Sequence, residues 1–292
     1  MSGVVELFGL ATSGRAEPDW QTVVRRQVCP FVDRRCFKVR KSMPEVSIGT
    51  CTVLHGGGPV VICPIRMLER RQVLTDCLHL LTGHEPGNEL HVVPEVGVPG
   101  GNIDYVLASA RDGRVRDFVG IELQTLDTTG TVWPVRQRFL ASQGVPVAAK
   151  DLSSVRPYGM NWKMTAKTIL VQLHHKVQTF ESVNKHLVLV LQDRLLSYMQ
   201  GEFSFRHLNQ PRVADPMHFH AYSMAAVPGG HRLSLASRLS TDTAGIAVCL
   251  GLQGETRIEL DVIVRLIEQK IGPPTLLALD RPVVPMSVPP EV

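Results

Sequence analysis

Two strand-like segments joined by a tight turn constrain this fold more than any other feature of the sequence. Within residues 102–124, "NIDYVLASA" and "DFVGIELQ" are apolar and are separated by "RDGR", whose Asp-Gly pair is typical of a short β-hairpin. Side chains alternate along a strand, so Leu123 would face the core while Glu122 and Gln124 share the other face. A carboxylate inside an apolar strand is costly unless a partner compensates its charge.

The hairpin predicts where the partner of Glu122 lies. Asp104 stands near the start of the first strand, so pairing of the strands would bring the two carboxylates together. Converging carboxylates repel each other unless a cation lies between them. Mg²⁺ binds carboxylates, backbone carbonyls and waters, and it can position a water for attack on a phosphodiester. The pattern is compatible with a nuclease site. Taken alone, however, it favours the alternative, in which Asp104 belongs to the turn and Glu122 pairs with a nearby arginine, because such spacings are frequent by chance.

Four of the six cysteines lie close together in the amino-terminal part of the chain. They are Cys29, Cys36, Cys51 and Cys63. In a reducing compartment, clustered thiols favour a tetrahedral thiolate site that holds zinc or iron. No CxxC pair is present, and buried free cysteines are the alternative.

The same part of the chain is strongly basic. The candidate DNA contacts there are Arg34, Arg35, Lys38, Arg40 and Lys41. A concentrated basic patch suits phosphate backbones, although a solvated protein surface would look the same.

Length and patterning predict a mixed α/β (or α+β) core with a small appended module. The 292 residues carry a net charge of +4, no apolar stretch is long enough to cross a membrane, and no secretory signal is evident, so a cytoplasmic location is expected. We expect a cysteine module over residues 1–66, a catalytic core over 67–272 and a proline-rich tail over 273–292. Helices are predicted at 67–83 and 163–183. Strands are predicted at 185–192, "HFHAYSM", "AVCLGL" and "RIEL", followed by a helix over "DVIVRLIEQKIG".

Asp-x(17)-Glu-x-Gln on a predicted hairpin looks like the PD-(D/E)XK nuclease motif, with glutamine in place of its usual lysine. Further segments in the same order are "VELFG", "VCPF", "RCFKVR", "GTCTV", "VICPIR", "IDYVL", "VGIELQTLDTTG" and "GMNWKMTAKTILVQLHHK". Over about residues 5–176 the chain resembles the NotI and EagI type II restriction endonucleases, whose fold is a PD-(D/E)XK core with an N-terminal metal-binding module of four cysteines.

The resemblance implies roles for individual residues. Asp104 and Glu122 would bind Mg²⁺, Leu123 would offer its backbone carbonyl to the ion, and Gln124 would replace the motif's lysine. The four clustered cysteines would hold a single structural iron, or alternatively zinc. Glutamine carries no charge, so the missing charge would come from a second metal ion or from another basic residue, for which Lys163, Lys167 and Lys176 are candidates. Further DNA-contact candidates on the predicted long helix are Lys167, Gln172 and Lys176.

The resemblance also implies an activity and partners. We expect a prokaryotic homodimer that cleaves double-stranded DNA at a short GC-rich palindrome with a CGGCCG-like core, leaving 5′-phosphate and 3′-hydroxyl ends. Its genetic partner would be a cognate DNA methyltransferase, and no membrane would be involved. The alternatives are a less specific repair or mobile-element nuclease, and a non-catalytic DNA-binding protein whose cysteine module is the working part.

Overall fold

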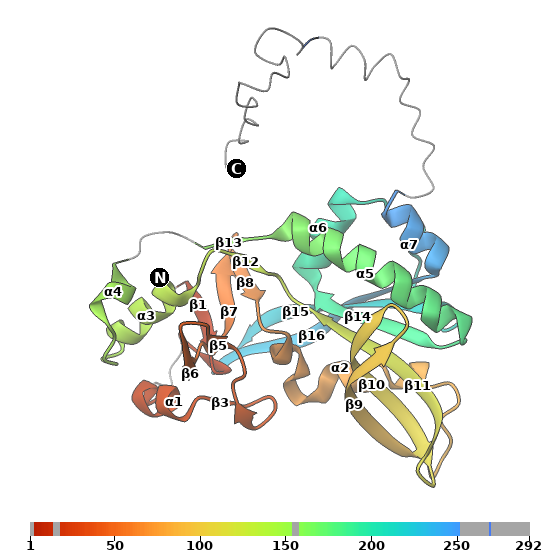
Figure 1. Cartoon of the computed structure of the whole chain (residues 1–292), viewed down its shortest axis with the longest axis horizontal. Coiled ribbons are helices and arrows are strands. Elements are labelled where there is room, and N and C mark those ends of the chain that lie inside the picture. The colour runs from red at the N-terminus through yellow and green to blue at the C-terminus, as the bar shows by residue number, and fades with distance from the viewer. Residues whose placement is uncertain (1–2, 14–17, 154–157, 252–268, 270–292) are drawn as a thin grey trace, which may run out of the picture. The chain divides into compact units, whose positions relative to one another are not determined.

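A mixed six-stranded sheet lies at the centre of the fold (Figure 1). This computed structural model describes residues 3–13, 18–153, 158–251 and 269. The strand order is β16-β15-β14-β11-β10-β9; β14 is parallel to β11 and β15, and the other neighbours are antiparallel. The strands are β9 (Glu89–Val98), β10 (Gly101–Arg111), β11 (Arg114–Gln124), β14 (His186–Gln192), β15 (Met217–Val227) and β16 (Gly230–Thr241). The predicted mixed α/β class is confirmed.

The predicted hairpin is formed by β10 and β11. Asp112 and Gly113 at its tip have φ values of 52° and 71°, as a two-residue hairpin turn requires. Tyr105 lies opposite Ile121 in the register. The side chain of Leu123 is buried in an apolar cluster, as the alternation of the strand predicts.

Three helices cover one face of the sheet (Figure 1): α5 (Trp162–Ser182), α6 (Asp193–Glu202) and α7 (Thr243–Cys249). Gly120 on β11 permits close packing there, because a Cβ atom would lie 2.5 Å from the ring of Phe180 on α5. The strand expected at "AVCLGL" is wrong: its described part ends α7, which begins where Asp242 accepts a hydrogen bond from the Gly245 backbone N–H. A short apolar run does not distinguish a buried helix from a strand.

Short helical turns pack against the opposite face of the sheet. They are η1 (Pro64–Arg71), α2 (Gln72–Thr75) and η2 (Leu78–Leu80). The single helix expected over residues 67–83 is therefore wrong. Arg70 and Arg71 have φ values of 53° and 58°, and this left-handed backbone breaks the helix between η1 and α2.

The amino-terminal part forms a smaller sheet with the strand order β2-β1-β7-β8. These strands are β1 (Val4–Leu7), β2 (Leu10–Ala11), β7 (Thr50–His55) and β8 (Gly58–Val61). Around them lie α1 (Trp20–Arg26), β3 (Val28–Cys29), β4 (Arg34–Arg35), β5 (Val39–Arg40), β6 (Met43–Ser47), β12 (Thr128–Thr129), α3 (Trp133–Ser142), α4 (Ala149–Leu152) and β13 (Gly159–Met160). The ring of Trp20 on α1 meets that of Phe139 on α3 edge-on at 5.0 Å, which joins this sheet's helices in one apolar cluster.

The described residues up to position 251 belong to one compact unit. The strand expected at "RIEL", the helix expected over "DVIVRLIEQKIG" and the proline-rich tail lie outside the described residues, apart from residue 269. None of the helices that the structure describes is both long and apolar enough to cross a membrane.

Candidate active site

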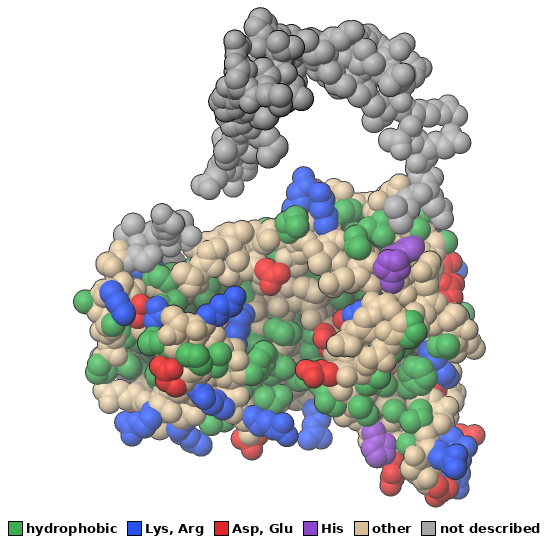
Figure 2. Space-filling view, viewed as in Figure 1, with side chains coloured by type: hydrophobic (Ala, Val, Ile, Leu, Met, Phe, Trp, Pro, Cys, Tyr) green, Lys and Arg blue, Asp and Glu red, His purple; other side chains and the backbone are tan. Residues whose placement is uncertain are grey.

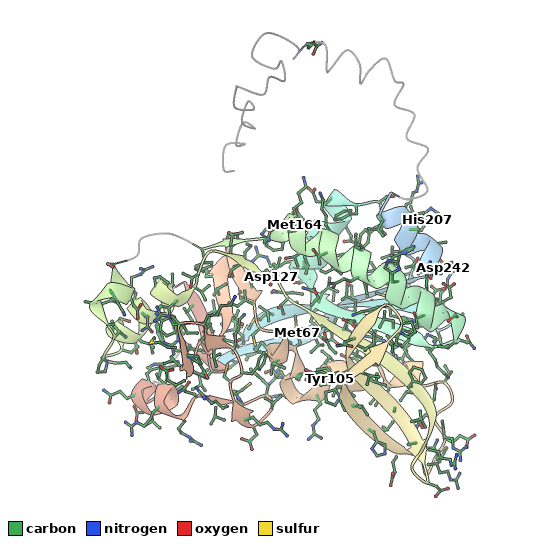
Figure 3. All side chains as sticks on the ribbon, viewed as in Figure 1. Met67, Tyr105, Asp127, Met164, His207 and Asp242 are labelled. Carbon is green, nitrogen blue, oxygen red and sulfur yellow. The ribbon has the colours of Figure 1, made fainter. Side chains whose placement is uncertain are left out.

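Asp104 and Glu122 lie at neighbouring positions of the paired strands β10 and β11. The register sets Tyr105, labelled in Figure 3, opposite Ile121, and its continuation by one residue sets Asp104 opposite Glu122. Oδ2 of Asp104 accepts a hydrogen bond of 2.8 Å from the backbone N–H of Leu123. The Asp104 side chain is exposed, whereas Glu122 is half-buried, so one edge of the pair is open to solvent.

A lysine from helix α5 reaches Glu122 across 54 positions of sequence. Nζ of Lys176 lies 2.7 Å from Oε1 of Glu122 and 2.6 Å from the backbone oxygen of Asn102. The Lys176 side chain is only 9% exposed, so the ammonium lies inside the protein rather than on the outer face of α5. The partner of Glu122 is thus a lysine distant in the sequence. Its positive charge compensates the desolvation of a carboxylate in an apolar strand.

Two glycines let the chain before β10 approach α5 closely enough for this contact. Gly100 has a φ of 96°, and a Cβ atom there would lie 3.1 Å from the backbone carbon of His175. Gly101 has a φ of 130° and faces Cε of Lys176. The pair "GG" before "NIDYV" is therefore the sequence signal for this approach, because a side chain at either position would strain the backbone.

Burial dominates the titration of Glu122. It raises the pKa of this carboxyl from 4.5 to about 7; the negative charge of Asp104 acts in the same direction, and the hydrogen bond from Lys176 acts against both. The carboxyl group therefore changes its charge near neutral pH in the protein without bound ions.

The side chains of Gln124 and Leu123, the other two residues of the predicted motif, make no hydrogen bond to the two carboxylates among the contacts of the described residues. Gln124 is half-buried, and its Nε2 donates a 2.8 Å hydrogen bond to the backbone oxygen of Thr125. The side chain of Leu123 packs into the core, so only its backbone faces the carboxylates.

The four predicted cysteines line one small pocket. It is bordered by Cys29, Cys36, Cys51 and Cys63 together with Phe8, Phe37, Lys38, Gly49, Thr50 and Ile65. All four thiols are buried and free, and the cavity volume of about 10 Å³ corresponds to roughly one water-sized sphere. The fold therefore brings together four cysteines that belong to different short segments of residues 29–63.

The thiols of this pocket interact with one another. A hydrogen bond from Cys51 lowers the pKa of Cys63 to about 6, and the Lys38 ammonium acts in the same direction. The same hydrogen bond and burial raise the pKa of Cys51. In the part of the chain that the structure describes, however, no group of three or more His, Cys, Asp or Glu side chains is arranged to hold a metal ion.

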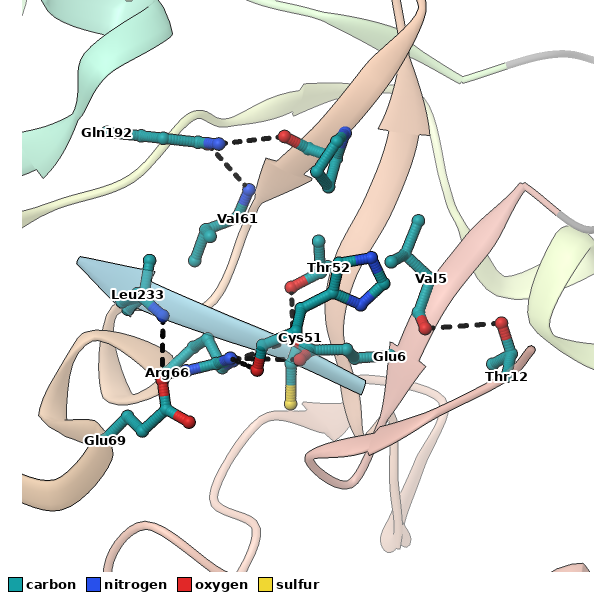
Figure 4. A network of polar contacts seen from close by, with 12 residues as sticks. Val5, Glu6, Thr12, Cys51, Thr52, Val61, Arg66, Glu69, Gln192 and Leu233 are labelled. Carbon is teal, nitrogen blue, oxygen red and sulfur yellow. Dashed lines mark hydrogen bonds and ion pairs between the residues drawn. The ribbon is translucent and has the colours of Figure 1, made fainter. Parts of the chain in front are cut away.

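A buried ion pair lies beside the cysteine pocket and connects the two sheets (Figure 4). Arg66 donates to both carboxylate oxygens of Glu6 on β1, at 2.7 and 3.0 Å, and to Glu69 at 2.9 Å. Oε2 of Glu69 also accepts the backbone N–H of Leu233 on β16. Arg66 is only 1% exposed, so these bonds are shielded from water. The network therefore fixes the smaller sheet, which carries Cys51, relative to the central sheet.

The basic candidates divide into exposed and internally bonded residues. Lys and Arg side chains gather along the lower edge of the face in Figure 2, over the region of α1 and β3. Arg34, Arg35 and Lys41 are exposed, although Arg35 donates to the backbone oxygens of two neighbouring residues. Lys38 donates to the backbone oxygen of Ile62, and Arg40 pairs with Asp151 at 3.1 Å.

Of the candidates on α5, Lys167 and Gln172 are exposed, whereas Lys176 is turned toward Glu122. The exposed pair keeps the outward orientation that contact with a nucleic acid would need.

The sequence matches the protein family described as "Restriction endonuclease NotI" over residues 21–233. This span contains the four cysteines of the pocket, both carboxylates and Lys176. No curated protein matches the chain. Restriction endonucleases are hydrolases that cleave double-stranded DNA, and they typically use Mg²⁺. The match covers well over half of the chain, and the chain therefore belongs to the NotI restriction endonuclease family.

Proposed function

We propose that this protein is a type II restriction endonuclease that cleaves both strands of a short GC-rich palindrome in a Mg²⁺-dependent reaction. The observation that carries the proposal is the placement of Asp104 opposite Glu122 at one end of the β10–β11 pairing, with one carboxylate exposed. The products would carry 5′-phosphate and 3′-hydroxyl ends.

The two carboxylates fit a hard divalent cation. Oδ2 of Asp104 accepts the Leu123 N–H and Oε1 of Glu122 accepts from Lys176, and the remaining oxygens of the two carboxylates would bind the ion. The backbone oxygen of Leu123 would be the third protein ligand. When bound, Mg²⁺ would polarise the attacking water and stabilise the leaving oxygen.

The protein's own groups would orient the reactants. The Leu123 N–H fixes the rotamer of Asp104, and Lys176 fixes that of Glu122. Oε1 of Gln124 could accept a hydrogen bond from the attacking water, since the amide nitrogen is already used by Thr125. The exposed edge at Asp104 gives a DNA phosphate access to the pair.

The cysteine segment would hold one structural metal ion, iron or alternatively zinc. Support comes from four buried, free thiols on one pocket of suitable size. Because the side chains do not already form a ligand group, binding would require the thiols to rotate toward the pocket centre. We assign residues 1–66 to this module, 67–272 to the PD-(D/E)XK nuclease core and 273–292 to the proline-rich tail.

The proposed substrate is two-fold symmetric, so a homodimer with one active site per strand is the matching assembly. Exposed Arg34, Arg35 and Lys41 are suited to phosphate contacts, and arginines would read guanine. A cognate DNA methyltransferase would protect the host genome.

The test is incubation of the purified protein with a sequenced GC-rich plasmid, with Mg²⁺ or with EDTA. Discrete Mg²⁺-dependent fragments support the proposal, and sequencing of their ends gives the recognition site. A smear would instead indicate a nuclease with loose sequence preference. Intact plasmid with a salt-sensitive gel shift would indicate a DNA-binding protein without catalysis.

A further inference from the structure

We propose that Lys176 on helix α5 supplies, through its contact with Glu122, the positive charge that the nuclease motif ordinarily carries at position 124. It acts as a positioning residue: its ammonium holds Glu122 and compensates the charge that gathers at the paired carboxylates. This inference rests on the proposed function of Asp104 and Glu122 as the cleavage site.

The position of Lys176 on α5 is the first argument. Neighbouring positions on its buried face are apolar, with Leu173, Val177 and Phe180 at most 2% exposed. An apolar residue at position 176 would extend this face at no desolvation cost, whereas a buried ammonium must be compensated. Burial of an ion pair gives little net stability compared with apolar packing, so stability alone does not account for a lysine here.

The hydrogen bonds of Lys176 are the second argument. An ammonium has three donors. Two of them are directed to the Asn102 backbone oxygen and to Oε1 of Glu122. The third remains for a water or a phosphate oxygen, and these are the groups that a lysine at position 124 would serve.

Gln124 gives the third argument. Its side-chain nitrogen donates to the backbone of Thr125 and supplies no charge. The other two lysines of α5, Lys163 and Lys167, lie in its first half and are exposed. Among the lysines of α5, Lys176 is therefore the one that contacts a carboxylate of the site.

The test compares Lys176→Gln, the double variant Lys176→Gln with Gln124→Lys, and a control, Lys150→Gln, which removes an exposed charge on α4. Single-turnover cleavage by Lys176→Gln should be slower by about 100-fold, the usual effect of removing one preorganised charge. The double variant should recover at least about a tenth of the wild-type rate, and Lys150→Gln should match wild type.

Mn²⁺ binding without DNA, followed by electron paramagnetic resonance, gives a readout that is independent of cleavage. Lys176→Gln should bind Mn²⁺ at least as tightly as wild type, since a competing cation beside Glu122 is gone. Slow cleavage with retained Mn²⁺ binding and rescue by lysine at position 124 supports the inference.

An unchanged rate in Lys176→Gln would overturn the inference. A joint loss of rate and Mn²⁺ affinity without rescue would also overturn it, because that result describes a merely structural lysine. Failure of the proposed function looks different: the wild-type protein itself would then not cleave DNA.

Discussion

The ammonium of Lys176 lies 2.7 Å from Oε1 of Glu122, although the two residues belong to a helix and a strand far apart in the sequence. Glu122 in turn stands opposite Asp104, whose Oδ2 accepts the N–H of Leu123. One buried cation and one backbone amide therefore fix the two carboxylates before any ion binds.

Asp104→Asn should abolish cleavage while leaving the fold intact. The amide keeps an oxygen that can accept the Leu123 N–H, but it removes the charge that would bind Mg²⁺. We expect cleavage to fall by about 1,000-fold or more, with a change in Tm within about 2 °C. Single-turnover kinetics and thermal unfolding in EDTA check this, and a large drop in Tm would show that Asp104 has a structural role instead.

Ionisation of Glu122 should make the metal-free protein less stable as the pH rises. Its pKa is raised from 4.5 to about 7, so the folded state binds the proton more tightly than the unfolded state does. Ionisation in the folded protein is therefore the unfavourable step, and this residue's contribution to stability falls as the pH rises from about 4.5 to about 7. The loss is at most about 3 kcal/mol, and it is constant above that range.

Urea unfolding in EDTA at pH 5 and pH 8.5 measures this effect by comparing wild type with Glu122→Gln. The two proteins differ only at position 122, so the pH-dependent part of the difference between them reports the Glu122 carboxyl group. Wild type should lose stability relative to the variant at the higher pH. The opposite sign would mean that the ion pair outweighs burial.

Purified protein should contain about one metal ion per chain in the cysteine pocket, because a structural thiolate site binds one ion through four ligands. Cys36→Ser should lose that ion and unfold at a lower temperature. Cys249→Ser is the matched control, as Cys249 is equally buried but lies on α7, outside the pocket. Elemental analysis of all three proteins measures their metal content, and thermal unfolding measures their stability. A wild-type protein that contains no metal and unfolds at the same temperature as Cys36→Ser would show that the cysteines are ordinary core residues.

The basic surface near α1 predicts a salt-dependent DNA affinity. Replacing both Arg34 and Lys41 by Gln should weaken binding and reduce the slope of log K against log salt by about 0.9 for each phosphate that is no longer neutralised. Lys150→Gln should leave the slope unchanged. Fluorescence anisotropy over a range of salt concentrations measures both, and equal slopes for all proteins would show that the DNA phosphates bind to another surface.

Local sequence patterns predicted much of what lies within one hairpin or one helix. The β10–β11 hairpin follows from its Asp-Gly turn and alternating residues, and α5 follows from its helical spacing. The convergence of Asp104 and Glu122 needed only the hairpin register. These features depend on residues within one helix or one hairpin, a stretch of about twenty residues that the sequence displays directly.

Features that depend on packing between distant segments were not predicted. The contact between Lys176 and Glu122 could be predicted only from the way α5 crosses the sheet. The left-handed backbone at Arg70 and Arg71 could not be predicted because neither residue is a glycine. The strand β16 was not anticipated either, since its serines and arginines hide the apolar alternation. Only the glycine pair at residues 100 and 101 gave a signal for the helix contact.

Cleavage by Glu122→Gln beside Glu89→Gln, compared with wild type on one sequenced GC-rich plasmid, tests the central claim most directly. Glu89 lies on β9 of the same sheet, and its side chain is 71% exposed, so its variant makes the same chemical change away from the site. We predict Mg²⁺-dependent fragments with 5′-phosphate ends for wild type and Glu89→Gln, and intact plasmid for Glu122→Gln. Undiminished cleavage by a folded Glu122→Gln variant would contradict the account.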